Sequence, residues 1–497
     1  MSGFIEGVDR NQVTLFPDRV EDWIDEDSLV RVVDLFVDEL DLADLGFARA
    51  SHARTGRPGY HPSVLLKLFI YGYLNRVPSS RALEREAGRN VEVMWLMGRL
   101  IPDHKTIADF WRDNGAAIRK TCAGFVQICR QIGVLKGDCV AIDGSRFKAV
   151  NNRDKNFTKG KIASRIAHLE AGIDRYLEEM VRIDRQDKVE AREEKIANLA
   201  RRYGRIRQEI QRLQEMDQAL NDAPDGQISL TDAEARAMAT SARGSRLIGY
   251  NTQSAVDTET HLIVAHDVTN TGHDRDQLAP MAQAAKAGLG RDEMKAVADR
   301  GYFSGRDILA CHEDGITTTL PRPETSGNRR KGMYVKADFA YDTAADVYRC
   351  PVGETLTYRY TTEEAGLILR RYWTNMCADC PVKARCTTGN ERRITRWEHE
   401  HLVDEMRERM SCDPSLMRLR RSTVEHPFGT IKAWMGATHF RMRRLTHVRT
   451  EMALHVLAYC GSASKCAPPP LTWPNALIPI LFFATEWGQD RRRVHSR

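Results

Sequence analysis

Three acidic residues of the sequence stand where carboxylates could bind divalent cations. Asp143 follows the apolar segment VAI, and Asp299 follows the segment KAVA. Glu425 is the single acidic residue between positions 416 and 449, where eight Lys and Arg residues gather. Carboxylate oxygens suit Mg²⁺, and two such ions about 4 Å apart can activate a water or hydroxyl and stabilise a leaving oxygen. We therefore expect two-metal phosphoryl transfer at Asp143, Asp299 and Glu425, provided that the fold brings these Mg²⁺ ligands together.

Each carboxylate also has a purely structural interpretation. The pair Asp143-Gly144 is typical of a turn that closes a strand. Ser422-Thr423-Val424-Glu425 fits the capping box, in which a serine and a glutamate three residues later satisfy exposed helix amides. Pro427 complicates that capping box, because a proline at the fifth helical position would delete a hydrogen bond. The helix would then begin near His426 or be kinked.

Cations around Glu425 favour contact with an anionic polymer. At about 100° per residue, Arg421, Glu425 and Lys432 fall within a stripe of about 40° on one helix face. A solvated ladder of salt bridges could produce the same stripe. The flanking sequence adds only cations, however, which a ladder does not need and a phosphate backbone does. We expect phosphate contacts from Arg421 and Lys432, and also from Arg441, Arg443 and Arg444, whose alternative is a solvated surface.

Four cysteines form a second group with ligand spacing. Cys377, Cys380 and Cys386 follow the pattern C-x2-C-x5-C, and Cys350-Pro-x-Gly lies upstream. Four thiolates could hold a structural Zn²⁺ in a closed site without an open position. The alternative is a set of reduced, partly buried cysteines, because a single C-x2-C is a weak signal.

Two further patterns favour structural roles. His266-Asp267 is expected at a strand end and His273-Asp274 at a helix start, where aspartate is a good cap, so a histidine metal site is disfavoured. Ser145 follows Asp143 without a histidine-based triad around it, so it is not expected to be a nucleophile.

The elements that must position these residues begin with helices. Residues 28 to 131 read as helices with short breaks, such as SVLLKLFIYGYL (63 to 74) and SRALEREAG, which begins after Ser79 or Ser80 and ends at Gly88. Another helix is expected near Thr106. Arginines around the break at residues 76 to 89 fit a helical DNA-binding domain, although a plain helical bundle has the same pattern.

A mixed α/β pattern follows. GDCVAIDGSRF (137 to 147) predicts a buried strand ending in the Asp143-Gly144 turn, and RLIGYNTQSAV (246 to 256) with HLIVAHDVT (261 to 269) predicts an antiparallel hairpin. DRDQLAPMAQAAKAGLG predicts a helix ended by glycine. KAVADRGY (295 to 302) and GITTTLPRP (315 to 323) predict two more strands. Ligand sites of open sheets gather at the carboxyl ends of strands, where Asp143 and Asp299 are expected.

Two insertions interrupt this α/β domain. Apolar residues recur at threes and fours from 162 to 216 on either side of the polar segment DRQDKVEAREE, which predicts an antiparallel helical hairpin. The other insertion is polar and carries the four cysteines. The predicted boundaries are 1–132 for the helical domain and 133–460 for the α/β domain. Within the latter, the hairpin is expected at 160–220 and the Cys-rich insertion at 324–412. An atypical tail occupies 461–497.

Composition agrees with a globular protein outside the membrane. The chain has 497 residues, 42% hydrophobic and 29% charged, with a net charge of only +6. Eleven cysteines and a start (MSGFIEGVDRNQ) unlike a signal peptide predict the reducing cytoplasm. The apolar stretch 471–487 is interrupted by two prolines, so no membrane span is expected.

The motifs together resemble a known family, the DDE transposases of bacterial insertion sequences, and most closely the group numbered eleven eighty-two. The resemblance covers about residues 10 to 460. It rests on TGRPGYHPSVLLKLFIYGYL, AIDGSRFKAVNNRDKNFT, LIGYNTQSAVD, VTNTGHDRDQL, ADRGYFS and RSTVEHPFGTIKAWMG, in that order. It implies an RNase H-like catalytic domain and a catalytic triad of Asp143, Asp299 and Glu425.

Two departures from the family pattern accompany the resemblance. Arg421, Glu425 and Lys432 match the signature Tyr-x2-Arg-x3-Glu-x6-Lys, but Arg418 stands in the place of the tyrosine. A phosphate contact from Arg418 is the expected replacement. The tail after HVLAYC is unlike a family C-terminus and suggests an altered reading frame or a degraded copy.

The resemblance implies a transposase that cuts the 3′ ends of an element and joins the freed hydroxyl to target DNA. Terminal inverted repeats, target DNA and two Mg²⁺ ions are the implied partners and cofactors, and a homodimer on paired ends is implied by resemblance only. Two alternatives remain open: a catalytically inactive DNA-binding remnant of a transposase, and a metal nuclease without joining activity.

Overall fold

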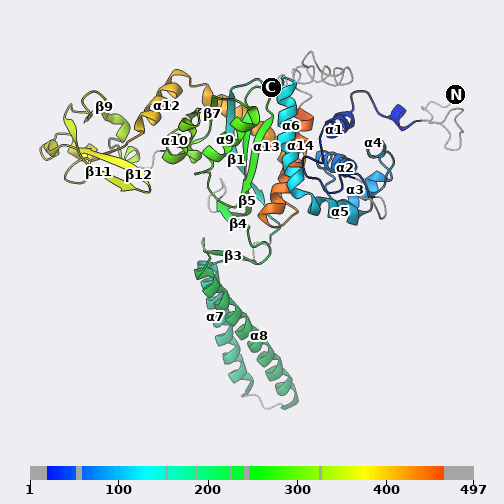
Figure 1. Ribbon diagram of the computed structural model, residues 1–497. Coiled ribbons are helices and arrows are strands. Elements are labelled where there is room, and N and C mark those ends of the chain that lie inside the picture. The colour runs from blue at the N-terminus through cyan, green and yellow to red at the C-terminus, as the bar shows by residue number, and fades with distance from the viewer. Residues whose placement is uncertain are drawn as a thin grey trace, which may run out of the picture.

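The computed structural model describes residues 19–51, 59–151, 155–184, 189–223, 226–239, 246–323 and 327–463. The predicted atypical tail therefore lies almost entirely outside the described residues. Figure 1 shows helices and a five-stranded sheet on opposite sides of a central sheet, and a long helical hairpin that points away from it. In the described ranges, no helix combines the length and apolar character that crossing a membrane requires.

The N-terminal part is helical, as predicted. Its helices are α1 (Leu29–Asp38), α2 (Pro62–Leu74), α3 (Ser80–Ala87), α4 (Val91–Leu96), α5 (His104–Asp113) and α6 (Gly115–Gln131). Local sequence sets several of their ends. The side chains of Asn90 and Asp103 accept hydrogen bonds from the first amides of α4 and α5, and Gly88 ends α3. The predicted starts near Ser80 and Thr106 are thus confirmed to within two residues.

A six-stranded sheet forms the centre of the molecule. Its strands are β1 (Cys139–Lys148), β4 (Arg236–Ala239), β5 (Arg246–Asp257), β6 (Ile263–Thr269), β7 (Met294–Val297) and β8 (Ile316–Thr319). The order is β4-β5-β1-β7-β8, and β6 pairs with β5 as well. β5 is antiparallel to β1 and to β6, whereas β7 is parallel to both β1 and β8. This arrangement confirms the predicted mixed α/β class, the β5–β6 hairpin and the strands β7 and β8.

The predicted turn at Asp143-Gly144 is wrong, because β1 continues through both residues to Lys148. Its pairing with β5 is unbroken from Val140 opposite Asp257 to Lys148 opposite Gly249. Gly144 serves close packing rather than a turn: a Cβ there would lie 2.5 Å from Nε2 of Gln253 on β5. The local turn signal of Asp-Gly is therefore overridden by long-range strand pairing.

Helices cover the sheet and join it to the N-terminal part. They are α9 (Leu278–Leu289), α10 (Gly305–Glu313), α12 (Glu400–Cys412), α13 (Leu416–Gly429) and α14 (Leu445–Ala463). Gly290, in the left-handed conformation, ends α9 as predicted. Along α14, side chains such as Val448, Met452 and Leu457 are almost fully buried in one core that runs from the N-terminal helices to the sheet. Each such side chain contributes about 1.5–3 kcal/mol to stability. The N-terminal helices are therefore packed on the central sheet through α14.

The predicted helical hairpin is confirmed. It consists of α7 (Lys159–Asp184) and α8 (Val189–Asn221), with the short strands β2 (Asn156–Thr158) and β3 (Gln227–Ser229) paired at its base. Phe157, Ile162, Leu213 and Leu220 form a separate small core at that base. Farther out the two helices pack mainly on each other, as Figure 1 shows.

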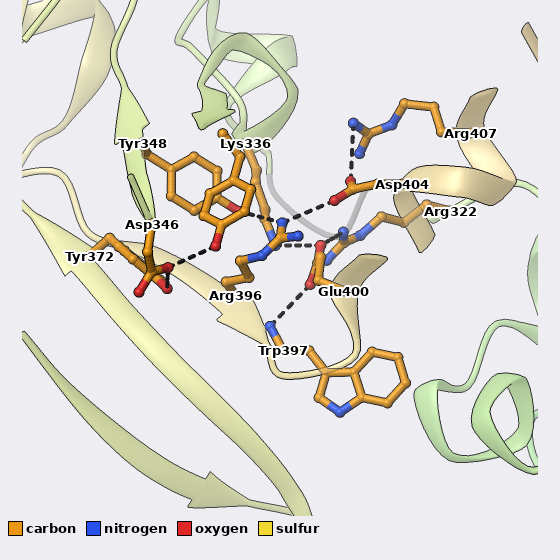
Figure 2. Close-up of polar contacts among 11 residues, drawn as sticks. Arg322, Lys336, Asp346, Tyr348, Tyr372, Arg396, Trp397, Glu400, Asp404 and Arg407 are labelled. Atoms are coloured by element: carbon orange, nitrogen blue, oxygen red, sulfur yellow. Dashed lines mark hydrogen bonds and ion pairs between the residues drawn. The ribbon is translucent and has the colours of Figure 1, made fainter. Parts of the chain in front are cut away.

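Residues 327–412 form a second antiparallel sheet with α12. The order is β13-β12-β11-β10-β9, with β9 (Ala340–Asp342), β10 (Val347–Arg349), β11 (Thr355–Glu364), β12 (Leu367–Trp373) and β13 (Ile394–Trp397). A buried polar network holds this part on the central sheet (Figure 2): the carboxylate of Glu400 accepts hydrogen bonds from Arg322, Lys336 and the amide of Trp397. Arg322 follows β8 of the central sheet, so Glu400 links the two sheets.

Candidate functional site

Asp143 and Asp299 lie side by side at the parallel pair β1–β7. Ala141 on β1 is opposite Val297 on β7, and each aspartate comes two residues later. The carboxylate of Asp299 accepts a hydrogen bond of 2.7 Å from the amide of Gly301, at the start of the 3₁₀ turn Arg300–Tyr302. The pairing of the two strands, rather than the predicted turn after β1, brings the two carboxylates together.

The electrostatics of Asp143 reflect its crowded surroundings. Burial raises the pKa of Asp143 to about 6. The guanidinium of Arg420 works against this rise, while the charges of Asp299 and Asp274 add to it. Like charges held close together and partly removed from water favour binding of a cation.

Arg420 on α13 supplies the one cation that pairs with Asp143 within the described ranges. Its Nη2 lies 2.6 Å from Oδ1 of Asp143, and 14% of its side chain is exposed. The sequence did not single out Arg420, because the predicted stripe through Arg421 and Glu425 places Arg420 on another face of the helix. That other face is the one that packs on β1.

Asp274 is a further carboxylate at this position, and its predicted role as a helix cap is wrong. α9 begins only at Leu278, and its N-cap is Gln277. Instead, Oδ1 of Asp274 accepts hydrogen bonds from Nδ2 of Asn251 (2.7 Å) and Nε2 of Gln253 (2.9 Å). The hydroxyl of the fully buried Tyr302 donates to Oε1 of the same glutamine. Polar residues at alternate positions of an otherwise buried strand were the sequence signal for this network.

Glu425 is not joined to the two aspartates by any hydrogen bond or ion pair among the described residues, and its side chain is exposed. The capping-box interpretation is wrong as well, since α13 begins at Leu416 and Ser422 lies in its middle, donating to the carbonyl oxygens of Arg418 and Leu419. Pro427 lies inside this helix. The predicted late start near His426 therefore does not occur.

Lys432 turns toward the sheet rather than toward solvent. It lies in a π-helical segment, Thr430–Trp434, whose wider turn rotates it away from the face of Arg421 and Glu425. Its Nζ donates to Oγ of Ser145 (2.5 Å) and lies 4.5 Å from the ring centre of Phe147. Burial lowers the pKa of Lys432, and the charge of Asp143 works against this change.

The other predicted phosphate-binding residues are exposed. They are Arg418, Arg421, Arg441, Arg443 and Arg444. The first two lie on α13, and the other three precede α14 in a turn whose amides at 441 and 442 donate to the carboxylate of Glu451. These guanidinium groups are free to meet an anionic ligand.

The four cysteines of the predicted zinc site line a single small cavity of about 20 Å³ in the β9–β13 part. Burial raises the pKa of Cys386, and the other three thiols add to this rise. Cys350 begins a tight turn in which its carbonyl oxygen accepts from the amide of Gly353. As the described side chains stand, no three Cys, His, Asp or Glu residues form a group arranged to hold a metal ion, either here or at Asp143.

Comparisons with known proteins agree with the pattern of carboxylates and cations. Residues 18–113 match the family described as Transposase domain (DUF772), and residues 222–460 match the Transposase DDE domain. Asp299 and Glu425 fall within the second match, whereas Asp143 lies between the two. A search of curated proteins found no match.

One solved structure aligns over most of the chain. It is the cryo-EM structure of a piggyBac transposase synaptic complex with hairpin DNA, which is 7% identical. The alignment covers 93% of this chain and 76% of that chain, with a TM-score of 0.33. The two structures differ too much at this score for the likeness to carry an argument.

Proposed function

Because the two family matches support a DDE-type transposase of the insertion-sequence kind, we propose that this chain cuts the ends of an element and joins them to target DNA. In this proposal a water first cuts the 3′ end of the element. The freed 3′ hydroxyl then attacks a phosphate of the target DNA in line, without a covalent protein intermediate. The observation that carries the proposal is the adjacency of Asp143 and Asp299 under α13.

The donor set fits Mg²⁺. Asp143, Asp299 and Asp274 present carboxylate oxygens around one position, with Arg420 as their one paired cation among the described residues. Oxygen ligands and a surplus of negative charge are what Mg²⁺ prefers. When bound there, a pair of Mg²⁺ ions would activate the attacking oxygen and stabilise the leaving oxygen.

We propose Asp143, Asp299 and Glu425 as the catalytic carboxylates. Glu425 is five residues beyond Arg420 on the same helix, or about 7.5 Å along its axis. It could therefore approach Asp143 if α13 rotates and Arg420 leaves the carboxylate. The released Arg420 would join the exposed Arg418 and Arg421 in contacting phosphates, while Lys432 would support β1 from below.

Several wider features belong to the same proposal. The central sheet is taken as RNase H-like, with β5 and β6 antiparallel to β1 and with β7 and β8 parallel to it. The helical domain at 1–132 would bind terminal inverted repeats. A homodimer would hold paired ends, in the manner of the insertion-sequence group numbered eleven eighty-two.

We also propose that Cys350, Cys377, Cys380 and Cys386 hold a structural Zn²⁺ in the reducing cytoplasm. The support is the cavity that all four line, together with the C-x2-C spacing. Rotation of the thiols about their Cα–Cβ bonds would be needed to complete a tetrahedral site. Such a site would stabilise the β9–β13 part, whose own core is small.

A strand-transfer assay tests the proposed function. A labelled terminal fragment, a target plasmid and Mg²⁺ are incubated with the full chain, and joined products are measured on a gel. Asp143→Asn, Asp299→Asn and Glu425→Gln should each abolish cutting and joining while retention of the fragment in a mobility-shift assay persists. Asp138→Asn is the matched control, because this aspartate lies just before β1 and its side chain is 60% exposed.

The alternatives give different results in the same assay. A DNA-binding remnant would bind the fragment without cutting it. A nuclease would release cut fragments without joined products. Cutting that persists after chelation of divalent metal would contradict the catalytic proposal itself.

A further inference from the structure

Asp274 is held in one orientation by groups that are themselves buried. Asn251 and Gln253, at most 1% exposed, both donate to its Oδ1. Gln253 is fixed in turn by the hydroxyl of Tyr302, in the 3₁₀ turn after Asp299. Two amides and a phenol therefore fix a single carboxylate oxygen, and Oδ2 takes part in no hydrogen bond or ion pair in the described part of the chain.

Two glycines allow this carboxylate to come close to the proposed catalytic aspartates. A Cβ on Gly144, the neighbour of Asp143, would lie 2.6 Å from Oδ1 of Asp274. A Cβ on Gly301 would lie 2.9 Å from Oδ1 of Asp299 and 3.6 Å from Oδ2 of Asp274. The free oxygen of Asp274 thus faces the same small space as a carboxylate oxygen of Asp299.

The surroundings of the cluster contain unsatisfied groups as well. Ser254 is directly opposite Asp143 in the β1–β5 pairing, is 1% exposed, and its Oγ has no hydrogen-bond partner. A buried polar atom without a partner is uncommon and calls for an explanation, such as an ion or water bound nearby. A purely structural role for Asp274 would explain the bonds at Oδ1, but not the free Oδ2 or the negative charge that it adds beside Asp143.

We propose that Asp274 is an additional metal-binding carboxylate, whose Oδ2 joins Asp143 and Asp299 around a divalent cation. Asn251 and Gln253 act as positioning residues that aim this oxygen. The inference rests on the proposed function, because it assigns a further ligand to the same site. It also gives the site three carboxylates before Glu425 moves.

Binding of Mn²⁺ to the full chain without DNA tests the inference. Mn²⁺ takes the same oxygen ligands as Mg²⁺, and its free form is measured by electron paramagnetic resonance. Asp274→Asn should weaken Mn²⁺ binding by about 10-fold or more. Asp276→Asn is the matched control, since it changes the same charge two residues away on an exposed side chain, and it should bind Mn²⁺ like wild type.

The outcomes separate this inference from the proposed function. If Asp143→Asn loses Mn²⁺ but Asp274→Asn binds it like wild type, the assignment of Asp274 is wrong and the proposed function stands. If the wild-type chain binds no Mn²⁺ at a site that depends on Asp143, both are wrong. Should Asp274→Asn fail to fold by thermal melting, Asp274→Ser replaces it, because a hydroxyl can still accept from Asn251. A lower melting temperature with unchanged Mn²⁺ affinity would indicate a structural role only and overturn the inference.

Discussion

The buried carboxylate of Glu400 offers a sharp test of how the β9–β13 part is held (Figure 2). Its side chain is 4% exposed and pairs with Arg322 and Lys336. Burial opposes its ionisation, but these two cations outweigh burial and lower the pKa of Glu400 to about 2. Glu400→Gln would leave both cations partly buried without a counter-charge.

The magnitude follows from the two partners. A shift from the ordinary 4.5 to about 2 corresponds to about 3 kcal/mol for Glu400. Burial lowers the pKa of Lys336 to about 8 in spite of Glu400, and Arg322 is 40% exposed, so part of that gain is offset. We expect Glu400→Gln to reduce the free energy of unfolding by about 2–3 kcal/mol at pH 7.

Acidification should shrink this difference. Because the folded pKa lies below the unfolded one, the stabilisation is fully present above pH 4.5 and is lost as pH falls toward 2. At pH 3 the gap between wild type and variant should be smaller by about 2 kcal/mol.

Urea unfolding followed by tryptophan fluorescence measures both effects. Glu398→Gln is the control: it is exposed, two residues away, and should change stability by less than about 0.5 kcal/mol. A Glu400→Gln variant as stable as this control, or a gap that widens in acid, would refute the reasoning.

Two further predictions concern the sheet and the cysteines. Gly249→Ala places a Cβ 1.9 Å from the carbonyl oxygen of Phe147, so we expect a loss of about 3 kcal/mol or failure to fold in thermal melting, whereas Gly204→Ala, which faces open space, should melt like wild type. Metal analysis of the purified chain should find about one zinc per chain, lost in Cys377→Ser and kept in the exposed Cys412→Ser; a zinc-free wild type would contradict the proposed site.

Local signals predicted most elements well. The β5–β6 hairpin follows from alternating apolar residues, α9 ends at a glycine, and the helical hairpin follows from its repeat. Asp143 failed as a turn residue because pairing with β5 depends on residues more than 100 positions away, which no local pattern contains.

The candidate site was only partly predictable for a similar reason. The stripe of Arg421, Glu425 and Lys432 assumed a regular helix, and a π-helical turn breaks it. Asp274 resembled a helix cap in sequence, yet tertiary hydrogen bonds from β5 turn it toward Asp143. Side-chain direction at the end of a strand or helix depends on neighbours that meet only in the folded chain.

The length of the helical hairpin has a mechanical consequence. α8 has 33 residues and is therefore about 50 Å long, with its small core confined to the end nearest the sheet. It acts as a lever arm: a tilt of about 10° at the base would carry the far end through about 9 Å. A slight repacking around Phe157 would thus be magnified into a displacement wider than the diameter of a side chain.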